Sequence, residues 1–270
     1  MAAADPVLLS VDATSGVATV TLNRPDALNA LDAAMTQGLR ETFAEIAGRK
    51  DIRAVLLAGA GEHFMAGGDI RVFAQFNTRP RQERPDLARP LIQGVGEAIS
   101  TLRTMPQPVV ARVQGACAGF GLSLANACDM TIAADDAYFT LAYINIGTSP
   151  DGSGSFFLPR LVGPKRAAEI ALLGGRFDAA TAEHWGMVNA VHPRAELEAE
   201  AAKVAGRLAA MPAAALARTK ALLNHAMDND LSAQLTAEED SFSACTATAD
   251  WEEGIDAFLN RRKPAFNREG

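Results

Sequence analysis

Short β-like runs alternate with helical segments in the first part of the chain, whereas the sequence after about residue 195 is helical throughout. The apolar run RAVLLAGA at 53–60 has glycine near its end, and PVVARV at 108–113 runs into Gly115. Continuous apolar runs of this length are typical of strands that are buried on both faces, as in a parallel sheet. This order of elements predicts an α/β core with a helical C-terminal region, and we place the boundary between residues 195 and 196.

Local signals define several elements. The runs 7–11 and 17–22 predict a hairpin, and Asp32 precedes a segment with helical apolar spacing. Asp250 with Glu253 three residues later has the spacing of a capping box and predicts the start of the last helix. The polar segment 77–86, with two prolines, predicts a mobile loop beside a pocket.

Composition excludes several classes of protein. The 270 residues are 49% hydrophobic with a net charge of −7, and no basic run is dense enough to bind nucleic acid. The three cysteines have neither CxxC nor zinc-site spacing, which indicates free thiols and no metal. No signal peptide or apolar run of membrane-spanning length is recognisable. We therefore expect a cytoplasmic protein that binds neither nucleic acid nor membrane.

Two glycine-rich segments follow predicted strands: HFMAGGDI at 63–70 and GACAGFGLSLANACD at 115–129. Glycine at such places lets a ligand approach exposed backbone N–H groups, or lets a helix pack closely on a sheet. Neither segment is a P-loop, and the glycine pair at 119 and 121 lacks the context of a dinucleotide fingerprint. The pattern alone favours close packing.

Four segments together give a more specific signal: TLNRPDALNALD at 21–32, HFMAGGDI at 63–70, 108–139 from PVVARV to DAYF, and 149–175 from SPDGSG to LLGG. In this order and spacing they resemble the enoyl-CoA hydratase/isomerase (crotonase) family over nearly the whole chain. The resemblance implies a spiral β/α core, a C-terminal helical trimerisation region, and a homotrimer or a hexamer made of two trimers. It also implies an acyl-CoA thioester as substrate and no separate cofactor, since coenzyme A is part of the substrate.

By this resemblance, the backbone N–H groups of Ala66 and Phe120 form an oxyanion hole for the thioester carbonyl. Two preorganised donors at this oxygen stabilise an enolate, each contributing about 10²–10³ in rate. The same resemblance assigns further residues to acyl-CoA binding: Arg24, Ala27, Leu28, Gly67, Gly68, Asp69, Ile70, Gly119, Tyr143, Pro150, Lys263 and Phe266. Lys263 and Phe266, near the C-terminus, are expected to reach a coenzyme A, including that of a neighbouring subunit.

The reaction depends on other side chains. Hydratases of the family carry two glutamates that activate water, and the matching positions here are Ser123 and Tyr143. A hydroxyl and a phenol cannot replace two carboxylates as base and acid, which argues against ordinary hydration of a 2-enoyl-CoA. We assign no chemistry to Ser123, which leaves room in the pocket.

Asp151 in SPDGSG has two interpretations. Pro-Asp-Gly is a good turn sequence, and aspartate is a favoured N-cap for the helix that follows. In the isomerases of the family, however, an acidic residue here moves a proton between acyl carbons. The string SPDGSGSFFLPRLVG resembles the branch of 1,2-epoxyphenylacetyl-CoA isomerases of phenylacetate catabolism and Δ3-Δ2-enoyl-CoA isomerases, so we expect Asp151 to be catalytic, walled by Phe120, Tyr143, Phe156 and Phe157.

Alternatives remain open at this stage. They are a hydratase-type lyase of the same family, a non-catalytic acyl-CoA-binding protein, and a dehalogenase-like enzyme in which the histidine expected near Gly96 is missing. Glu62 and His63 are interpreted as exposed turn residues, and His184 as a packing or surface residue. Asp69 and Asp129 are interpreted as caps or structural acceptors.

Overall fold

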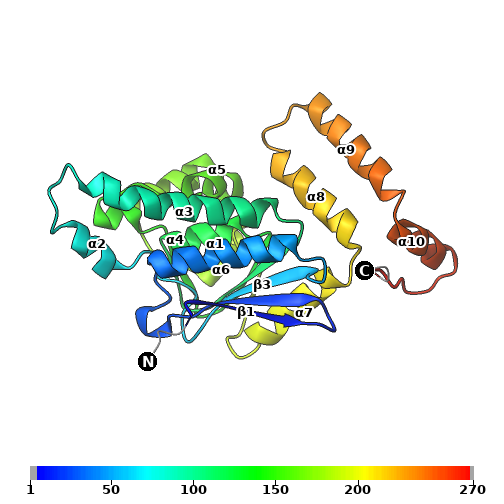
Figure 1. Ribbon diagram of the computed structural model, residues 1–270, viewed down its shortest axis with the longest axis horizontal. Coiled ribbons are helices and arrows are strands. Elements are labelled where there is room, and N and C mark those ends of the chain that lie inside the picture. Colours follow the sequence, from blue (N-terminus) through cyan, green and yellow to red (C-terminus); the bar gives the residue numbers. More distant parts are fainter. Residues whose placement is uncertain (1–4, 268–270) are drawn as a thin grey trace.

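A computed structural model describes residues 5–267 as two β-sheets surrounded by helices (Figure 1). The larger sheet has the order β1-β2-β3-β4-β6-β9, in which β1 and β2 pair antiparallel and the other neighbours are parallel. Its strands are β1 (Val7–Asp12), β2 (Val17–Leu22), β3 (Ala54–Gly59), β4 (Val109–Val113), β6 (Met130–Ala134) and β9 (Ala190–His192). The predicted hairpin and both buried strands are confirmed.

Helices cover both faces of the larger sheet. On one face α1 (Ala33–Gly48) and α3 (Arg84–Thr104) pack on side chains that include Val55 and Leu57. On the other face α7 (Leu197–Ala209) packs on Leu56 and its neighbours. Because successive side chains of a strand point to opposite faces, β3 is buried completely, which explains its uninterrupted apolar sequence.

The smaller sheet lies beside the carboxyl end of the larger one and has the order β5-β7-β8. It consists of β5 (Ala116–Ala118), β7 (Tyr138–Thr140) and β8 (Phe177–Asp178). The elements around it are η1 (Pro25–Ala27), α2 (Ile70–Phe76), α4 (Phe120–Ala127), η2 (Tyr143–Ile146), α5 (Gly154–Leu173) and α6 (Ala179–His184). Single β-bridges join Leu31 to Gly68 and Met65 to Cys117, so the chain segments that follow β3 and β4 lie next to each other.

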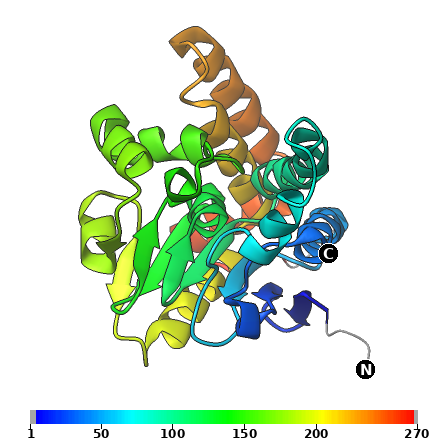
Figure 2. The ribbon, with the colours of Figure 1, turned by 90° about the vertical axis from the view of Figure 1, so that its left-hand side faces the viewer.

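The last three helices leave the core. They are α8 (Ala213–His225), α9 (Leu231–Cys245) and α10 (Ala249–Leu259). Figure 1 shows them at one end of the long axis, and Figure 2 shows the α8–α9 hairpin standing away from the sheet. Since α7 packs on the sheet, the projecting part begins at α8; the functional division after residue 195 stays a prediction.

A buried lysine ties α8 to the core. Lys220 is 7% exposed. Its Nζ lies 3.0 Å from the carbonyl oxygen of Leu102, 2.8 Å from that of Gln107 and 2.9 Å from Oδ2 of Asp129. Asp129 also accepts from Arg103 and from the N–H of Val109, which confirms it as a structural acceptor.

Two predicted boundaries are wrong. The polar loop is shorter than 77–86, because α3 begins at Arg84. The N-cap of α10 is Thr248, whose hydroxyl accepts from the N–H of Trp251, while the Asp250 carboxylate accepts from the N–H of Asn267. The capping-box pattern at 250–253 therefore lay inside the first turn of the helix.

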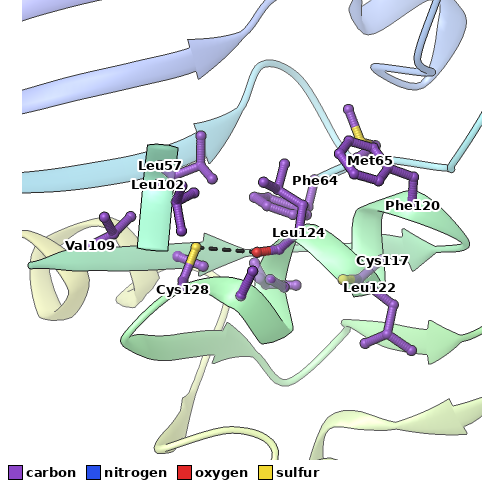
Figure 3. Packing of buried hydrophobic residues seen from close by; sticks show 14 of the residues in the cluster. Leu57, Phe64, Met65, Leu102, Val109, Cys117, Phe120, Leu122, Leu124 and Cys128 are labelled. Carbon is purple, nitrogen blue, oxygen red and sulfur yellow. Dashed lines mark hydrogen bonds between the residues drawn. The ribbon is translucent and has the colours of Figure 1, made fainter. Parts of the chain in front are cut away.

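The cysteines are free thiols, as expected, with Cys117 and Cys128 buried. Burial raises the pKa of both thiols. Figure 3 shows them within the core cluster, where the Cys128 thiol donates to the carbonyl oxygen of Leu124. None of the helices in residues 5–267 combines the length and hydrophobicity needed to span a lipid bilayer.

Candidate active site

The two glycine-rich segments meet backbone to backbone. A Cβ atom built at Gly119 would lie 3.4 Å from the Cα of Gly67, and one at Gly67 would lie 3.1 Å from the carbonyl oxygen of Ala118. Both glycines have positive φ, at +92° for Gly67 and +51° for Gly119, a conformation that other residues rarely adopt. Their sequence therefore allows the segments that carry Ala66 and Phe120 to approach closely.

Close packing of α4 on the neighbouring strand segment is confirmed as well. A Cβ atom at Gly121 would lie 2.3 Å from the carbonyl oxygen of Met65. Figure 3 shows Phe120 at the start of α4 beside Met65. Of the two purposes that the sequence suggested for these glycines, close packing is confirmed, and approach of a ligand to the backbone N–H groups stays a prediction.

The two expected oxyanion donors differ in the structure. The N–H of Phe120 is the first of α4, where no preceding helical turn supplies a carbonyl acceptor. The N–H of Ala66 donates to the carbonyl oxygen of Leu28 at 3.0 Å. For Ala66 to serve an oxyanion, this bond must be shared or released.

Residues expected to border the coenzyme A groove come together around the turn 24–31. The Arg24 guanidinium pairs with Asp32 at 3.0 Å and with Asp69 at 3.1 Å. Leu28 and Ile70 are 44% and 57% exposed, and Leu28 has φ +53°. The buried Asn29 side chain holds the turn through hydrogen bonds to the N–H of Arg24 and to three backbone carbonyls.

Asp69 is confirmed as a local cap, because its side chain accepts from the N–H of Arg71 at the start of α2. Hydrogen bonds from the Arg71 side chain, helped by Arg24, lower the pKa of Asp69 to about 2 against the opposing effect of burial. The carboxylate is therefore ionised, and it fixes both arginines beside the turn.

Asp151 lies in a small, partly buried polar cluster with Tyr143 and Ser123. The hydroxyl of Tyr143 donates to Oδ1 of Asp151 at 2.6 Å. The hydroxyl of Ser123 lies 3.2 Å from that of Tyr143 and 3.2 Å from the carbonyl oxygen of Asp151. Ser123 is fully buried and follows Phe120 by three residues, so one turn of α4 presents both the expected oxyanion donor and this hydroxyl.

The helix-cap interpretation of Asp151 is wrong for its side chain. The N-cap position of α5 is Ser153, and no side chain caps this helix. The carboxylate of Asp151 is instead turned toward Tyr143. Assigning Ser123 no more than space was also wrong, since its hydroxyl contacts both partners.

Burial raises the pKa of Asp151, and the hydrogen bond from Tyr143 acts in the opposite direction. Burial, followed by the negative charge of Asp151, raises the pKa of Tyr143 far above its ordinary value. Tyr143 is therefore a neutral hydrogen-bond donor, and Asp151, whose pKa is raised by burial, is the only carboxyl group of this cluster and its candidate for proton exchange.

Phe120 and Val95 wall the turn that carries Asp151. A Cβ atom at Gly152 would lie 2.5 Å from the Phe120 ring and 3.0 Å from Cγ1 of Val95. Of the other aromatic rings expected here, Tyr143 contacts Asp151, and Phe156 is exposed beneath Arg160. Phe157 packs against the core under Arg103, and its place as a wall of the site stays a prediction. Pro150 packs on the same turn, since a Cβ at Gly154 would contact it at 3.4 Å.

Lys263 and Phe266 are not brought to the groove of their own chain. Phe266 packs near Gly254 of α10 and lines a small cavity with residues of α8 and α10. Figure 1 shows α10 and α2, which begins at the groove residue Ile70, at opposite ends of the long axis. Contact with a neighbouring subunit's coenzyme A stays a prediction.

Three other candidates lie outside this cluster. Glu62 and His184 are exposed, as expected, whereas His63 is half-buried and its Nδ1 accepts from the N–H of Ala116. Gly96, where a dehalogenase-like reaction would require histidine, is exposed on α3.

Sequence reasoning missed two features of the site. One is the contact of Tyr143 with Asp151, and the other is the bond from Ala66 to Leu28. For the contact between Tyr143 and Asp151, the sequence carried a usable signal, which was the phenol of Tyr143 in place of a carboxylate. For the hydrogen bond from Ala66 to Leu28 it carried no signal, because this bond depends on the left-handed backbone of Leu28.

The fold and the site define a protein built around two glycine-rich loops and the half-buried carboxylate of Asp151. Comparison with known proteins agrees with this class. The sequence model of the family "Enoyl-CoA hydratase/isomerase" matches residues 12–269. The chain therefore belongs to the enoyl-CoA hydratase/isomerase family, whose members are enzymes that act on CoA thioesters.

Individual relatives carry different activities in their names. The chain is 37% identical to 1,2-epoxyphenylacetyl-CoA isomerase of Escherichia coli (strain K12), over 93% of this chain and 95% of that protein. It is 32% identical to crotonyl-CoA hydratase of Syntrophomonas wolfei, over 93% and 94%. Among solved structures, an enoyl-CoA hydratase from Polaromonas sp. JS666 superimposes with a TM-score of 0.90 at 36% identity, covering 97% of this chain and 99% of that one.

Proposed function

We propose that the protein is an acyl-CoA isomerase that shifts a double bond, or rearranges a ring epoxide, through a thioester enolate. The observation that carries the proposal is the single carboxylate of Asp151, half-buried beside the start of α4, with hydroxyl groups at the two positions where hydratases carry glutamate. One carboxylate is sufficient for moving a proton between two carbons, whereas hydration by this family uses two.

For a 3-enoyl-CoA, the Asp151 carboxylate takes a proton from C2. The electron pair of that C–H bond forms the C1–C2 double bond of a dienolate, with negative charge on the thioester oxygen. The N–H groups of Phe120 and Ala66 stabilise this oxygen once Ala66 is released from Leu28. Protonated Asp151 then returns the proton to C4, the carbonyl re-forms, and the double bond lies between C2 and C3.

Burial suits Asp151 to this role. A carboxyl group whose pKa is raised toward the working pH both accepts and returns a proton efficiently. The apolar surfaces of Phe120 and Val95 exclude water from the same place. These features support isomerisation over hydration, for which water must be held and activated.

The test follows the ultraviolet absorbance of the conjugated thioester after a 3-enoyl-CoA is mixed with the protein. We expect turnover by the parent and a loss of about 10²–10⁴ in Asp151→Asn, the usual contribution of a general base. Asp136→Asn, at an exposed aspartate paired with Arg194, is the matched control. Crotonyl-CoA is offered in parallel to measure hydration.

Other outcomes would favour the alternatives. Hydration of crotonyl-CoA without isomerisation would indicate a hydratase, in keeping with the names of several relatives. Binding of acyl-CoA without turnover would indicate a non-catalytic member of the family. The names of the relatives also make an aromatic acyl group, as in phenylacetate catabolism, a substrate to test beside straight-chain acyl groups.

We also propose a trimer-based assembly, either a trimer or a dimer of trimers. Large apolar side chains on the projecting helices support it, including Leu231, Phe242 and Phe258, which are 75%, 65% and 83% exposed. Sedimentation analysis of the purified protein tests the assembly.

A further inference from the structure

Tyr143 holds only one of the two carboxylate oxygens of Asp151. Its hydroxyl donates to Oδ1 at 2.6 Å, and no other residue in the described part of the chain donates to Oδ2. A carboxylate fixed through one oxygen has the other one free for a substrate proton. The two oxygens of Asp151 are therefore not equivalent.

The direction of the hydrogen bonds follows from the groups themselves. An ionised carboxylate only accepts, so the single hydrogen of the Tyr143 hydroxyl is directed at Asp151. At the 3.2 Å contact between Tyr143 and Ser123, the hydrogen then comes from the serine, which shares its single hydrogen with the carbonyl oxygen of Asp151, also at 3.2 Å. A phenol that accepts one hydrogen bond is a stronger donor of the next, so Ser123 reinforces the bond from Tyr143 to Asp151.

The cluster is also held mechanically. Ser123 is fully buried, and a Cβ atom at Gly154 would lie 2.7 Å from its hydroxyl oxygen. The ring of Tyr143 packs against the core cluster. Both residues are therefore fixed by the fold, and the carboxylate takes its orientation from them.

We propose that Tyr143, supported by Ser123, is a positioning residue that fixes the Asp151 carboxylate so that Oδ2 alone carries out both proton transfers. This inference rests on the proposed isomerase function and assigns a role to the phenol that stands where hydratases have glutamate. Oδ2 takes the proton from C2 as the dienolate forms, and the same oxygen returns it to C4 as the carbonyl re-forms.

The surroundings of Asp151 make the effect of Tyr143 measurable. Among residues 5–267 the only titratable side chain that interacts with Asp151 is that of Tyr143. The other elements packed here present Phe120 and Ser123 from α4 and Val95 from α3. A change in the ionisation of Asp151 after removal of the phenol is thus due to the lost hydrogen bond.

The test is Tyr143→Phe, with Tyr138→Phe as the matched control, because Tyr138 is the other tyrosine of the chain and lies against Arg176. The pH profile of kcat/KM reports ionisation of the free enzyme. Without the donor the carboxylate is harder to ionise, so we expect the acid limb of Tyr143→Phe to move up by about 1–2 pH units. The control keeps the profile of the parent.

A second readout uses 3-enoyl-CoA labelled with deuterium at C2. We expect the parent to deliver part of the label to C4, and Tyr143→Phe to deliver a smaller fraction because the freed carboxylate turns and exchanges with water. Ser123→Ala leaves the Tyr143 ring in place, and it should shift the acid limb and the label transfer in the same direction as Tyr143→Phe, by a smaller amount. If Tyr143→Phe does not fold, the result for Ser123→Ala decides whether the inference holds.

An unchanged acid limb and unchanged label transfer in Tyr143→Phe would overturn the inference while leaving the isomerase function intact. Absence of isomerisation by the parent, or full activity of Asp151→Asn, would overturn the proposed function and the inference with it.

Discussion

Gly152 and the ring of Phe120 are in such close contact that a single methyl group does not fit between them. A Cβ atom at Gly152 would lie 2.5 Å from two ring carbons, and the residue has φ +52°. The contact joins the turn that carries Asp151 to the residue whose N–H is an expected oxyanion donor. The position of the Asp151 carboxylate is thereby coupled to the position of the start of α4.

Gly152→Ala is expected to destabilise the protein by about 1–3 kcal/mol, through the strained backbone and the overpacked ring. It should also lower isomerase turnover, because Asp151 is displaced. Urea denaturation and the ultraviolet assay measure the two effects. Gly96→Ala is the control: nothing lies within 4 Å of its Cβ position on α3, so a gain of about 0.5–1 kcal/mol is expected. Equal stability of the two variants would contradict the prediction.

Lys220→Met tests the anchor of the C-terminal helices. The substitution leaves two carbonyl oxygens without their donor and removes one of the cations that Asp129 contacts. Asp129 keeps Arg103, so we expect a loss on the order of 3 kcal/mol in the free energy of unfolding.

Lys203→Met is the matched control, since Lys203 is exposed and pairs only with a neighbour on its own helix. Its effect should stay within about 0.5 kcal/mol. Similar losses in both variants, measured by urea denaturation, would mean that burial of Lys220 contributes nothing specific.

The elements that were predictable from the sequence are those fixed by local pattern. The buried strands, the hairpin and the glycine contacts of the two loops follow from apolar runs and from backbone positions that only glycine tolerates. Lys220 gave no such signal, because its partners lie far earlier in the chain and its own helix is rich in alanine. Burial of this kind is decided by tertiary packing.

The carboxylate of Asp151 shows the same limit within the site. Its turn sequence is compatible with a helix cap, and the choice between cap and proton carrier depends on the direction of one side chain. That direction is set by Tyr143, which is placed by the left-handed conformation of Ala142 before η2. A resemblance to the family indicated the position, but only the structure shows the partner.

Thr248→Ala tests the corrected start of α10. The Thr248 hydroxyl accepts from the N–H of Trp251, so its removal should cost about 1 kcal/mol of local stability. Hydrogen exchange of the first amides of α10 measures the loss directly. Thr236→Ala, within α9 and exposed, removes a hydroxyl that caps nothing and should leave the exchange of α10 unchanged. Faster exchange in the control alone would contradict this assignment.

The effect of Asp151→Asn on the free energy of unfolding is expected to depend on pH. The direction of this dependence should be opposite to that for the same substitution at an ordinary surface aspartate. Burial raises the native pKa of Asp151 above that of the unfolded chain. The protonated group therefore favours the fold below the ordinary aspartate pKa of about 3.9, and this contribution is lost as the pH rises through the native pKa. Asparagine is uncharged at every pH and keeps this contribution. Asp151→Asn should therefore be more stable than the parent at neutral pH, and should show no such gain in acid.

Asp178→Asn provides the opposite case. Hydrogen bonds from Thr181 lower the pKa of Asp178. The ionised carboxylate therefore contributes to the stability of the fold above the ordinary aspartate pKa, and this contribution is lost on acidification. This variant should be less stable than the parent at neutral pH and equal to it in acid. Urea denaturation at about pH 7 and about pH 3, on either side of the ordinary aspartate pKa, compares the two. A neutral-pH loss of stability in Asp151→Asn would show that its ionised carboxylate is well solvated or paired in the native protein, and would count against a proton carrier with a raised pKa.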